Sequence, residues 1–190
     1  MIGSTAVVAL LIDNKYLSVA NVGDSKAILC RDGLPLELTT EHVPTDNTEC
    51  RRIKNNGGWI DYNSRLTPLV NGRLSMTRSF GNLLLKPDIV PCEPHIRHET
   101  LNELRDSFMV MCSDGLTHVM GDEEVVDVVG GHEKPVDAAS DLTSLAHQYG
   151  SHDDVTVMVV PLGMWECGQR VNQGVGYSSF RTILGGRSEG

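Results

Sequence analysis

Short apolar runs separated by turn residues open the chain and predict a β-meander. The runs cover residues 5–12, 16–22, 26–31 and 34–38. Asp13-Asn14 separates the first two runs and Asp32-Gly33 the last two, and Asp-Gly between apolar runs is a strong hairpin signal. Because all these connections are short, we expect the strands to be antiparallel neighbours.

The middle of the chain carries a weaker pattern. Asp46 and Glu49 have the spacing of a capping box, and Gly57 stands where a helix would end in the left-handed conformation. We therefore predict a helix over residues 47–56. Because few of its residues are apolar, we expect this helix to lie on the surface. Two strand-like pieces follow, at 59–62 and 73–77.

The last third of the chain predicts two strands with two helices between them. A continuous apolar run over residues 107–112 indicates a buried strand that stops at Ser113-Asp114-Gly115. Helices are predicted at 122–129 and 135–149, and a final strand at 155–161. In the second helix, apolar residues recur at helical spacing and predict the buried face: Val136, Ala139, Leu142, Leu145, Ala146 and Tyr149.

This order of elements favours an α+β, layered-sandwich fold, because strands and helices do not alternate strictly. The 190 residues are enough for one domain with a core, which we place at 1–165. From residue 168 the composition changes to Gly, Ser and Arg without periodicity. We therefore predict a flexible tail over residues 166–190.

Composition excludes several classes of function. The formal net charge is −9, with no basic stripe to neutralise phosphates, which argues against nucleic-acid binding. Five cysteines without short paired spacing favour a reducing compartment over a secreted disulfide framework. The longest apolar stretch, residues 6–12, is too short to cross a bilayer, so no membrane partner is expected.

Three aspartates stand at strand ends: Asp24, Asp114 and Asp153. If the strands are antiparallel neighbours, these carboxylates converge at one edge of a sheet. Clustered carboxylates repel one another unless a hard divalent cation neutralises them. Two such ions could activate a water and clamp a phosphoryl group. Aspartate at a strand end is mostly ordinary turn chemistry, which is the better explanation for any one of these residues alone. The pattern by itself therefore indicates no more than a possible metal-carboxylate site.

Several longer segments together resemble one family, the metal-dependent protein phosphatases of type 2C. The segments are Gly3-Ser4-Thr5-Ala6, Ala20 to Ala27, Glu41-His42 with Arg52-Ile53 and Gly57-Gly58, Asn71 to Gly81, Cys112 to Leu116, and Asp153 to Thr156. They span residues 3–160 in the order that the family has. Their joint order and spacing are specific, whereas no single segment would be.

The resemblance implies a four-layer αββα sandwich and hydrolysis of phosphoserine and phosphothreonine by water at a Mg²⁺ or Mn²⁺ pair. By motif, Asp114 and Asp153 match catalytic ligands of the binuclear centre, and Asp24 matches a residue of a third metal position. Asp153 is preferred to Asp154 because the family usually has Asp-Asn at this pair. The expected partner is a phosphorylated protein.

The chain also departs from the family pattern. The family's Asp-Gly-His-Gly motif and its phosphate-binding arginine precede the point where this chain begins. Asn82 stands where an aspartate usually follows Arg-Ser-Phe-Gly, and His118 stands near where another is common. Two alternatives to a phosphatase therefore stay open: a catalytically impaired form that binds partners, and a degenerate relic that does not fold cooperatively.

The segment from Ala146 to Trp165 resembles one branch of the family, the mitochondrial phosphatases that act on the branched-chain 2-oxoacid dehydrogenase complex. That resemblance implies a location in the mitochondrial matrix and this large complex as the partner. Without it, a cytoplasmic location fits the cysteine usage equally well.

Overall fold

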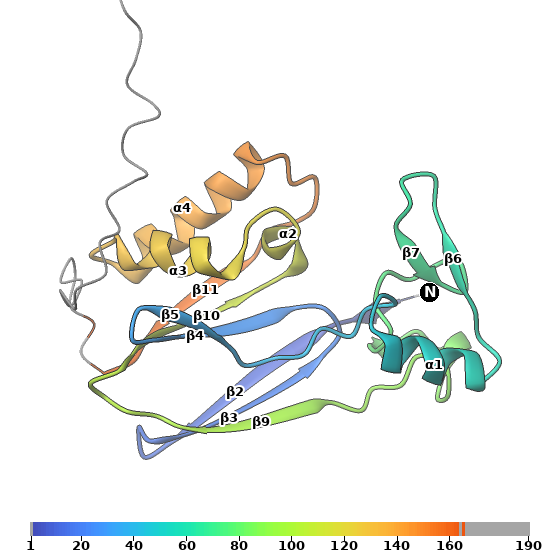
Figure 1. Ribbon diagram of the computed structural model, residues 1–190, viewed down its shortest axis with the longest axis horizontal. Coiled ribbons are helices and arrows are strands. Elements are labelled where there is room, and N and C mark those ends of the chain that lie inside the picture. The colour runs from blue at the N-terminus through green and yellow to red at the C-terminus, as the bar shows by residue number, and fades with distance from the viewer. Residues whose placement is uncertain (1, 164, 166–190) are drawn as a thin grey trace, which may run out of the picture.

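The computed structural model describes residues 2–163 and 165. They form two antiparallel sheets packed face to face, with two longer helices on one side and a separate lobe at one end (Figure 1). The predicted tail at 166–190 lies outside the described residues, so the predicted domain boundary stays a prediction. None of the helices described is long and apolar enough to cross a membrane.

The larger sheet has the strand order β11-β10-β4-β5, and every neighbouring pair is antiparallel. Its strands are β4 (Lys26–Arg31), β5 (Leu34–Glu37), β10 (Asp106–Cys112) and β11 (Val157–Pro161). Asp32 and Gly33 join β4 to β5 with φ values of 55° and 78°, which is the left-handed geometry of a tight hairpin turn. The predicted Asp-Gly hairpin is therefore confirmed.

The smaller sheet has the order β2-β3-β9, formed by β2 (Ala6–Ile12), β3 (Tyr16–Val22) and β9 (His95–Thr100). Its inner face packs on the larger sheet through a shared apolar core of Leu17, Val19, Ala27, Leu29, Leu38, Met109 and Leu162. In β4, alternate residues reach opposite sides, because Ile28 and Cys30 belong to a second core beneath the helices. Burial on both faces explains why these strands are continuously apolar rather than alternating.

Two helices cover the outer face of the larger sheet: α3 (Asp122–Gly130) and α4 (Pro135–Gln148), with the single turn α2 (Asp114–Thr117) at the end of β10. The buried face of α4 is centred on Ala138, Leu142 and Ala146. Val136 is 70% exposed and Tyr149 is also exposed. The prediction that these two residues belong to the buried face of α4 was therefore wrong. The outer face of the smaller sheet has no helix over it in the part of the chain described. The α+β sandwich is confirmed, with one of its two expected helical layers present there.

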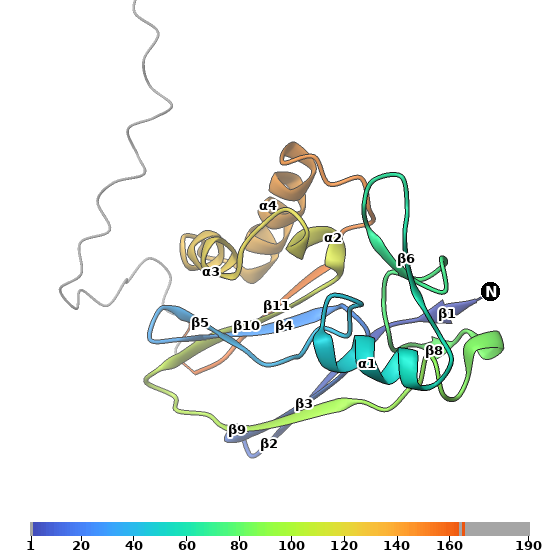
Figure 2. The ribbon, with the colours of Figure 1, turned by 45° about the vertical axis from the view of Figure 1, so that its right-hand side comes forward.

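The α1 lobe, residues 43–93, lies beside the sheets (Figures 1 and 2). It contains α1 (Asn47–Asn55), the pair β6 (Ile60–Tyr62) and β7 (Pro68–Val70), β8 (Phe80–Gly81), and the 3₁₀ turn η1 (Leu83–Leu85). β8 pairs with β1 (Gly3–Ser4). The helix ends as predicted, since Gly57 has φ 80° and the amides of Gly57 and Gly58 donate to Lys54 and Ile53.

The predicted strand at 73–77 is wrong. Asn71 and Gly72 have φ values of 49° and 65°, so the chain reverses directly after β7, and only Leu74 bridges back to Val70. The turn places those residues against β7 instead of extending them along a new strand. The strand β7 itself was not predicted.

Candidate functional site

The register of the larger sheet brings three separate segments to one edge. Cys112, the last residue of β10, pairs with Lys26 at the start of β4 and with Val157 at the start of β11. The turn before β4, the turn after β10 and the loop before β11 therefore meet at the same end of the sheet. These three connections carry Asp24, Asp114 and Asp153, and we call this place the carboxylate edge.

Asp24 is buried at this edge, with 5% of its surface exposed. Burial raises its pKa from 3.8 to about 6, and the nearby charge of Asp114 adds to the effect. The preceding Gly23 has φ 106°, and a Cβ atom there would lie 2.3 Å from the side chain of Thr5. The backbone turn that carries Asp24 therefore requires glycine.

Asp114 opens α2, and its side chain is a quarter exposed. One turn later, Nδ1 of His118 lies 3.9 Å from Oδ2 of Asp114. His118 is itself well exposed, and its effect on the pKa of Asp24 is smaller than those of burial and Asp114. Asp114 is close enough to Asp24 for its charge to raise the pKa of that carboxyl, after the larger effect of burial.

The backbone beside Asp153 is fastened to the turn that carries Asp114. The hydroxyl of Ser113 donates to the carbonyl of Asp154 at 3.0 Å, and the amide of Thr156 donates to the same hydroxyl. A Cβ atom on Gly115 would lie 2.6 Å from the carbonyl oxygen of Asp154, so only glycine allows this contact. The two loops are packed against each other at backbone level.

The carboxylate of Asp153 is directed differently. It is exposed, and its Oδ1 accepts a hydrogen bond of 2.8 Å from the amide of Asp154. Among the described residues, no group of three His, Cys, Asp or Glu side chains is arranged to hold a metal ion. The charge of Asp114 acts on the buried Asp24 carboxyl, and the backbone next to Asp153 is hydrogen-bonded to the turn that carries Asp114.

The donor chemistry of Asp24 and Asp114 fits a hard divalent cation. Carboxylate oxygens are the preferred protein ligands of Mg²⁺ and Mn²⁺, and a bound cation would offset the burial and the Asp114 charge that raise the pKa of Asp24. Two carboxylates supply only part of a six-oxygen shell. The residues present therefore fit a partial metal site.

Sequence reasoning missed Lys26, which lies at the same edge two residues after Asp24. Its ammonium group is 2.9 Å from Asp122, 3.1 Å from Glu37 and 3.8 Å from Glu41. Although burial opposes it, these acidic partners raise the pKa of Lys26. The sequence did contain a signal for this site, because a lysine at the start of an otherwise apolar, buried strand needs acidic partners.

A family model described as protein phosphatase 2C matches residues 1–155 of this chain. That match covers well over half of the sequence, including all three aspartates of the carboxylate edge.

The chain belongs to the protein phosphatase 2C family.

Curated relatives agree with this family. "Protein phosphatase 1K, mitochondrial" of Xenopus laevis is 44% identical over 179 residues, which is 94% of this chain and 48% of that protein. "Probable protein phosphatase 2C member 13, mitochondrial" of rice (Oryza sativa subsp. japonica) is 41% identical over 158 residues, which is 83% of this chain and 42% of that protein. The chain spans about half the length of the curated relatives it matches.

Solved phosphatase 2C structures share the fold. A serine-threonine phosphatase 2C from Toxoplasma gondii has a TM-score of 0.73 at 23% identity, over 83% of this chain and 58% of that one. A sex-determining protein of C. elegans has a TM-score of 0.76 at 27% identity, over 84% of this chain and 40% of that one. The expectation of a phosphatase 2C-like sandwich is confirmed.

Asn82, one of the departures from the phosphatase 2C pattern, is a buried structural residue here. Its φ is 51°, its side chain donates to the Ser79 hydroxyl at 2.7 Å, and its amide donates to the carbonyl of Ile2. Asparagine tolerates the left-handed conformation better than most residues, which suits it to this junction of β8 and η1. This environment is distinct from that of the carboxylate edge.

Proposed function

We propose that the protein carrying this chain is a metal-dependent protein serine/threonine phosphatase, in which Asp24, Asp114 and Asp153 help to hold two or more Mg²⁺ or Mn²⁺ ions. The observation that carries the proposal is the buried Asp24 carboxylate, whose pKa is raised by burial and by the charge of Asp114 at the same edge of the sheet. Such an arrangement costs stability unless a ligand uses it. Membership of the phosphatase 2C family supports the same reading.

In the proposed reaction, water attacks the phosphorus of a phosphoserine or phosphothreonine, and the serine or threonine hydroxyl leaves with a proton. When bound, the metal ions would supply positive charge to the phosphoryl oxygens and activate the attacking water. Asp114 and Asp24 would orient those ions, since each is fixed by a tight turn. Asp153 would join them once its carboxylate turned away from the amide of Asp154.

The finer assignment concerns substrate and place. Relatives from frog and rice are named mitochondrial phosphatases, which supports a mitochondrial location for this protein. We propose the mitochondrial matrix, with the branched-chain 2-oxoacid dehydrogenase complex as the phosphorylated partner. The net charge of −9 gives no reason to expect nucleic acid as a partner.

A second candidate function is a catalytically impaired form that binds or regulates a partner without turnover. The orientation of Asp153 favours it, because that carboxylate is exposed and accepts from a neighbouring amide. Under this alternative the carboxylate edge would bind metal weakly or not at all.

Calorimetric titration with Mn²⁺ separates the two candidates. We expect the chain to bind Mn²⁺, and we expect Asp114→Asn to weaken binding by about 10- to 100-fold, the range found for residues around protein metal sites. Asp127→Asn is the matched control, because Asp127 is exposed on α3 and belongs to no described ion pair.

Phosphate release from a phosphoserine peptide completes the test. We expect release that needs Mn²⁺, stops with chelator and is lost in Asp114→Asn, in a protein where this chain follows the N-terminal portion of the frog relative. Mn²⁺ binding without release would favour the binding or regulatory form. Release that Asp114→Asn leaves untouched would refute the assignment of this residue.

A further inference from the structure

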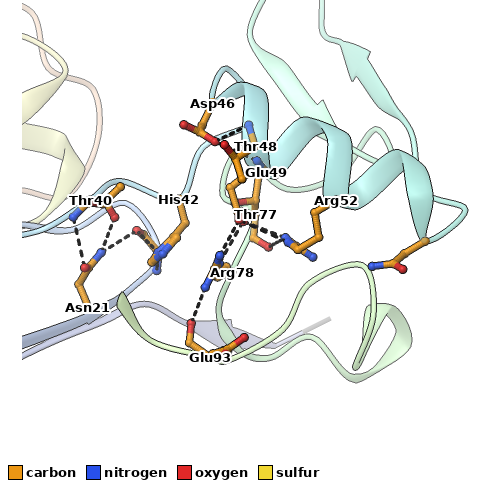
Figure 3. Close-up of polar contacts among 12 residues, drawn as sticks. Asn21, Thr40, His42, Asp46, Thr48, Glu49, Arg52, Thr77, Arg78 and Glu93 are labelled. Atoms are coloured by element: carbon orange, nitrogen blue, oxygen red, sulfur yellow. Dashed lines mark hydrogen bonds and ion pairs between the residues drawn. The ribbon is translucent and has the colours of Figure 1, made fainter. Parts of the chain in front are cut away.

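Glu49 does not close the capping box that its spacing predicted. Asp46 caps α1 as expected, since its Oδ1 accepts from the amides of Thr48 and Glu49 at 2.8 Å. The Glu49 carboxylate turns instead toward two arginines (Figure 3). It accepts from Arg52 at 2.8 Å and from Arg78 at 2.6 Å, and the Thr77 hydroxyl donates to it at 2.7 Å.

These four residues, Glu49, Arg52, Thr77 and Arg78, form what we call the Glu49 cluster. Through hydrogen bonds, the cluster connects several loops of the α1 lobe to α1. Arg52 also donates to the carbonyls of Asp88 and Ile89, and Arg78 donates to the carbonyl of Glu93. Thr77 is fully buried, so its backbone is fixed in a well-packed place.

From the Glu49 cluster a chain of hydrogen bonds leads to the turn that carries Asp24. The amide of Thr77 donates to the carbonyl of His42 at 2.7 Å. The amide of His42 donates to the carbonyl of Gly23 at 3.0 Å, and the amide of Gly23 donates to Nδ1 of His42 at 3.1 Å. His42 thus holds both polar backbone groups of Gly23, the residue next to Asp24.

Nδ1 of His42 also lies 3.2 Å from the carbonyl oxygen of Gly23, so its role depends on the tautomer. In the neutral tautomer with the proton on Nε2, Nδ1 keeps the lone pair that accepts from the Gly23 amide. Burial and, after it, the charge of Arg78 lower the pKa of His42, which favours that form. Asn21 braces the same stretch, since its side chain donates to the carbonyl of Thr40 at 2.7 Å. Residues 40–42 are therefore held by hydrogen bonds to Asn21 and Gly23 and, from the other side, to Thr77.

A restraint has a purpose here because the turn holds the Asp24 carboxylate in a buried place, with 5% of its surface exposed, and an unpaired buried carboxylate is costly. A free turn would relax and move the Asp24 carboxylate toward water, where its charge costs less. We propose that His42 is a positioning residue for Asp24: through Gly23 it holds the Asp24 turn in the carboxylate edge, with the Glu49 cluster as its anchor. The consequence for metal binding rests on the proposed function, whereas the restraint on the turn does not.

Two polar substitutions of His42 test the contact directly. In His42→Asn the amide oxygen can take the place of Nδ1, whereas in His42→Gln the acceptor lies further out, near the place of Nε2. We expect hydrogen exchange of the Gly23 amide to accelerate about three- to tenfold in His42→Gln, as for the loss of one net hydrogen bond. His42→Asn should keep the protection of the original protein.

Mn²⁺ affinity, measured by calorimetry, should follow the same order. We expect His42→Gln to weaken binding by about three- to tenfold and His42→Asn to leave it within twofold. Equal affinities in the two variants, together with equal exchange at Gly23, would overturn the proposal. If the chain joined to the N-terminal portion of the frog relative binds no Mn²⁺, the proposed function fails, and Gly23 exchange alone still decides whether His42 holds the turn.

The anchor is tested with Glu49→Gln against Asp106→Asn. Asp106 is a matched control, because it is also buried and also bound by an arginine, Arg31 at 2.7 Å, but it begins β10 at the opposite end of the strand from Asp114. Both variants should lower the free energy of unfolding. Only Glu49→Gln should accelerate Gly23 exchange under native conditions, and equal acceleration in both would show a general loss of stability and overturn the anchoring role.

Discussion

Glu49 and Asp24 are buried to nearly the same degree, with 4% and 5% of their surface exposed, yet their surroundings shift their pKa values in opposite directions. Although burial opposes it, hydrogen bonds from Arg78, Arg52 and Thr77 hold the pKa of Glu49 well below its ordinary value. Burial and Asp114 raise the pKa of Asp24 to about 6. The Glu49 cluster is internally satisfied, whereas the carboxylate edge is not.

The two residues show two uses of a buried carboxylate: Glu49 stabilises the fold, whereas Asp24 is suited to binding a cation. The cations around Glu49 are part of the chain, so the cluster needs nothing further. Among the described residues, no lysine or arginine forms an ion pair with Asp24 or Asp114, and an external cation would complete this pair. Lys26 is close to the edge, but three other carboxylates already surround it.

The two carboxylates should give opposite pH dependence. Glu49 has a lowered pKa in the folded state, so its contribution is present above its unfolded pKa of 4.5 and is lost as the pH falls below it. Asp24 has a raised pKa, so its contribution is present below 3.8 and is lost as the pH rises through about 6. Substituting Glu49 and Asp24 separately therefore tests the comparison between the Glu49 cluster and the carboxylate edge.

The largest effect should come from Glu49→Leu. This change leaves Arg52 and Arg78 without their carboxylate, and removing one partner of a buried ion pair costs about 3–5 kcal/mol. Urea denaturation at pH 7 measures the loss. Asp32→Asn breaks the exposed Arg105–Asp32 pair and should change little, because solvent screens it. Similar losses in the two variants would mean that the Glu49 cluster is no stronger than a surface pair.

Asp24→Asn should have the opposite sign in the metal-free protein. The shift from 3.8 to about 6 corresponds to about 3 kcal/mol at most, at about 1.36 kcal/mol for each pKa unit. We expect the variant to gain up to that amount above pH 6 and little at pH 4, where the folded wild type is already protonated at this site. Urea denaturation at both values tests this, with Asp127→Asn as the exposed control. A loss of stability at pH 7.5 would show that the hydrogen bond between the Asp24 carboxylate and its own backbone amide outweighs the effects of burial and of Asp114.

Local signals predicted much of the fold. The Asp32-Gly33 hairpin and the Gly57 helix end depend on residues next to each other, so the sequence contains the whole cause. The strand predicted at 73–77 failed because the Asn71-Gly72 turn folds that segment back, and its residues have no partner strand to extend along.

The sequence predicted which edge of the sheet holds the candidate site, but not how each side chain lies there. Antiparallel pairing of β10 with β4 and β11 brings the three aspartates to one edge, although these strands are far apart in the sequence. The predicted meander was wrong between β3 and β4, because these consecutive strands belong to different sheets. The direction of the Asp153 carboxylate depends on its local bond to the Asp154 amide, which no pattern encodes. The partners of Glu49 were missed for a related reason: Arg78 is 29 residues away and reaches it only through the fold.

His118→Lys should produce the smallest effect and sharpen the comparison furthest. His118 lies near Asp114 and weakly lowers the pKa of Asp24, and a permanent charge at this position would give the carboxylate edge a cation of its own. We expect the pKa of Asp24 to move toward its ordinary value, as followed by carboxyl NMR titration of the metal-free protein. His132→Lys is the control, because His132 lies 3.4 Å from Asp141 on α4 and belongs to a different surface. An Asp24 pKa that stays near 6 in His118→Lys would show that burial alone sets it, and that like-charge repulsion at the edge is too weak to require a cation.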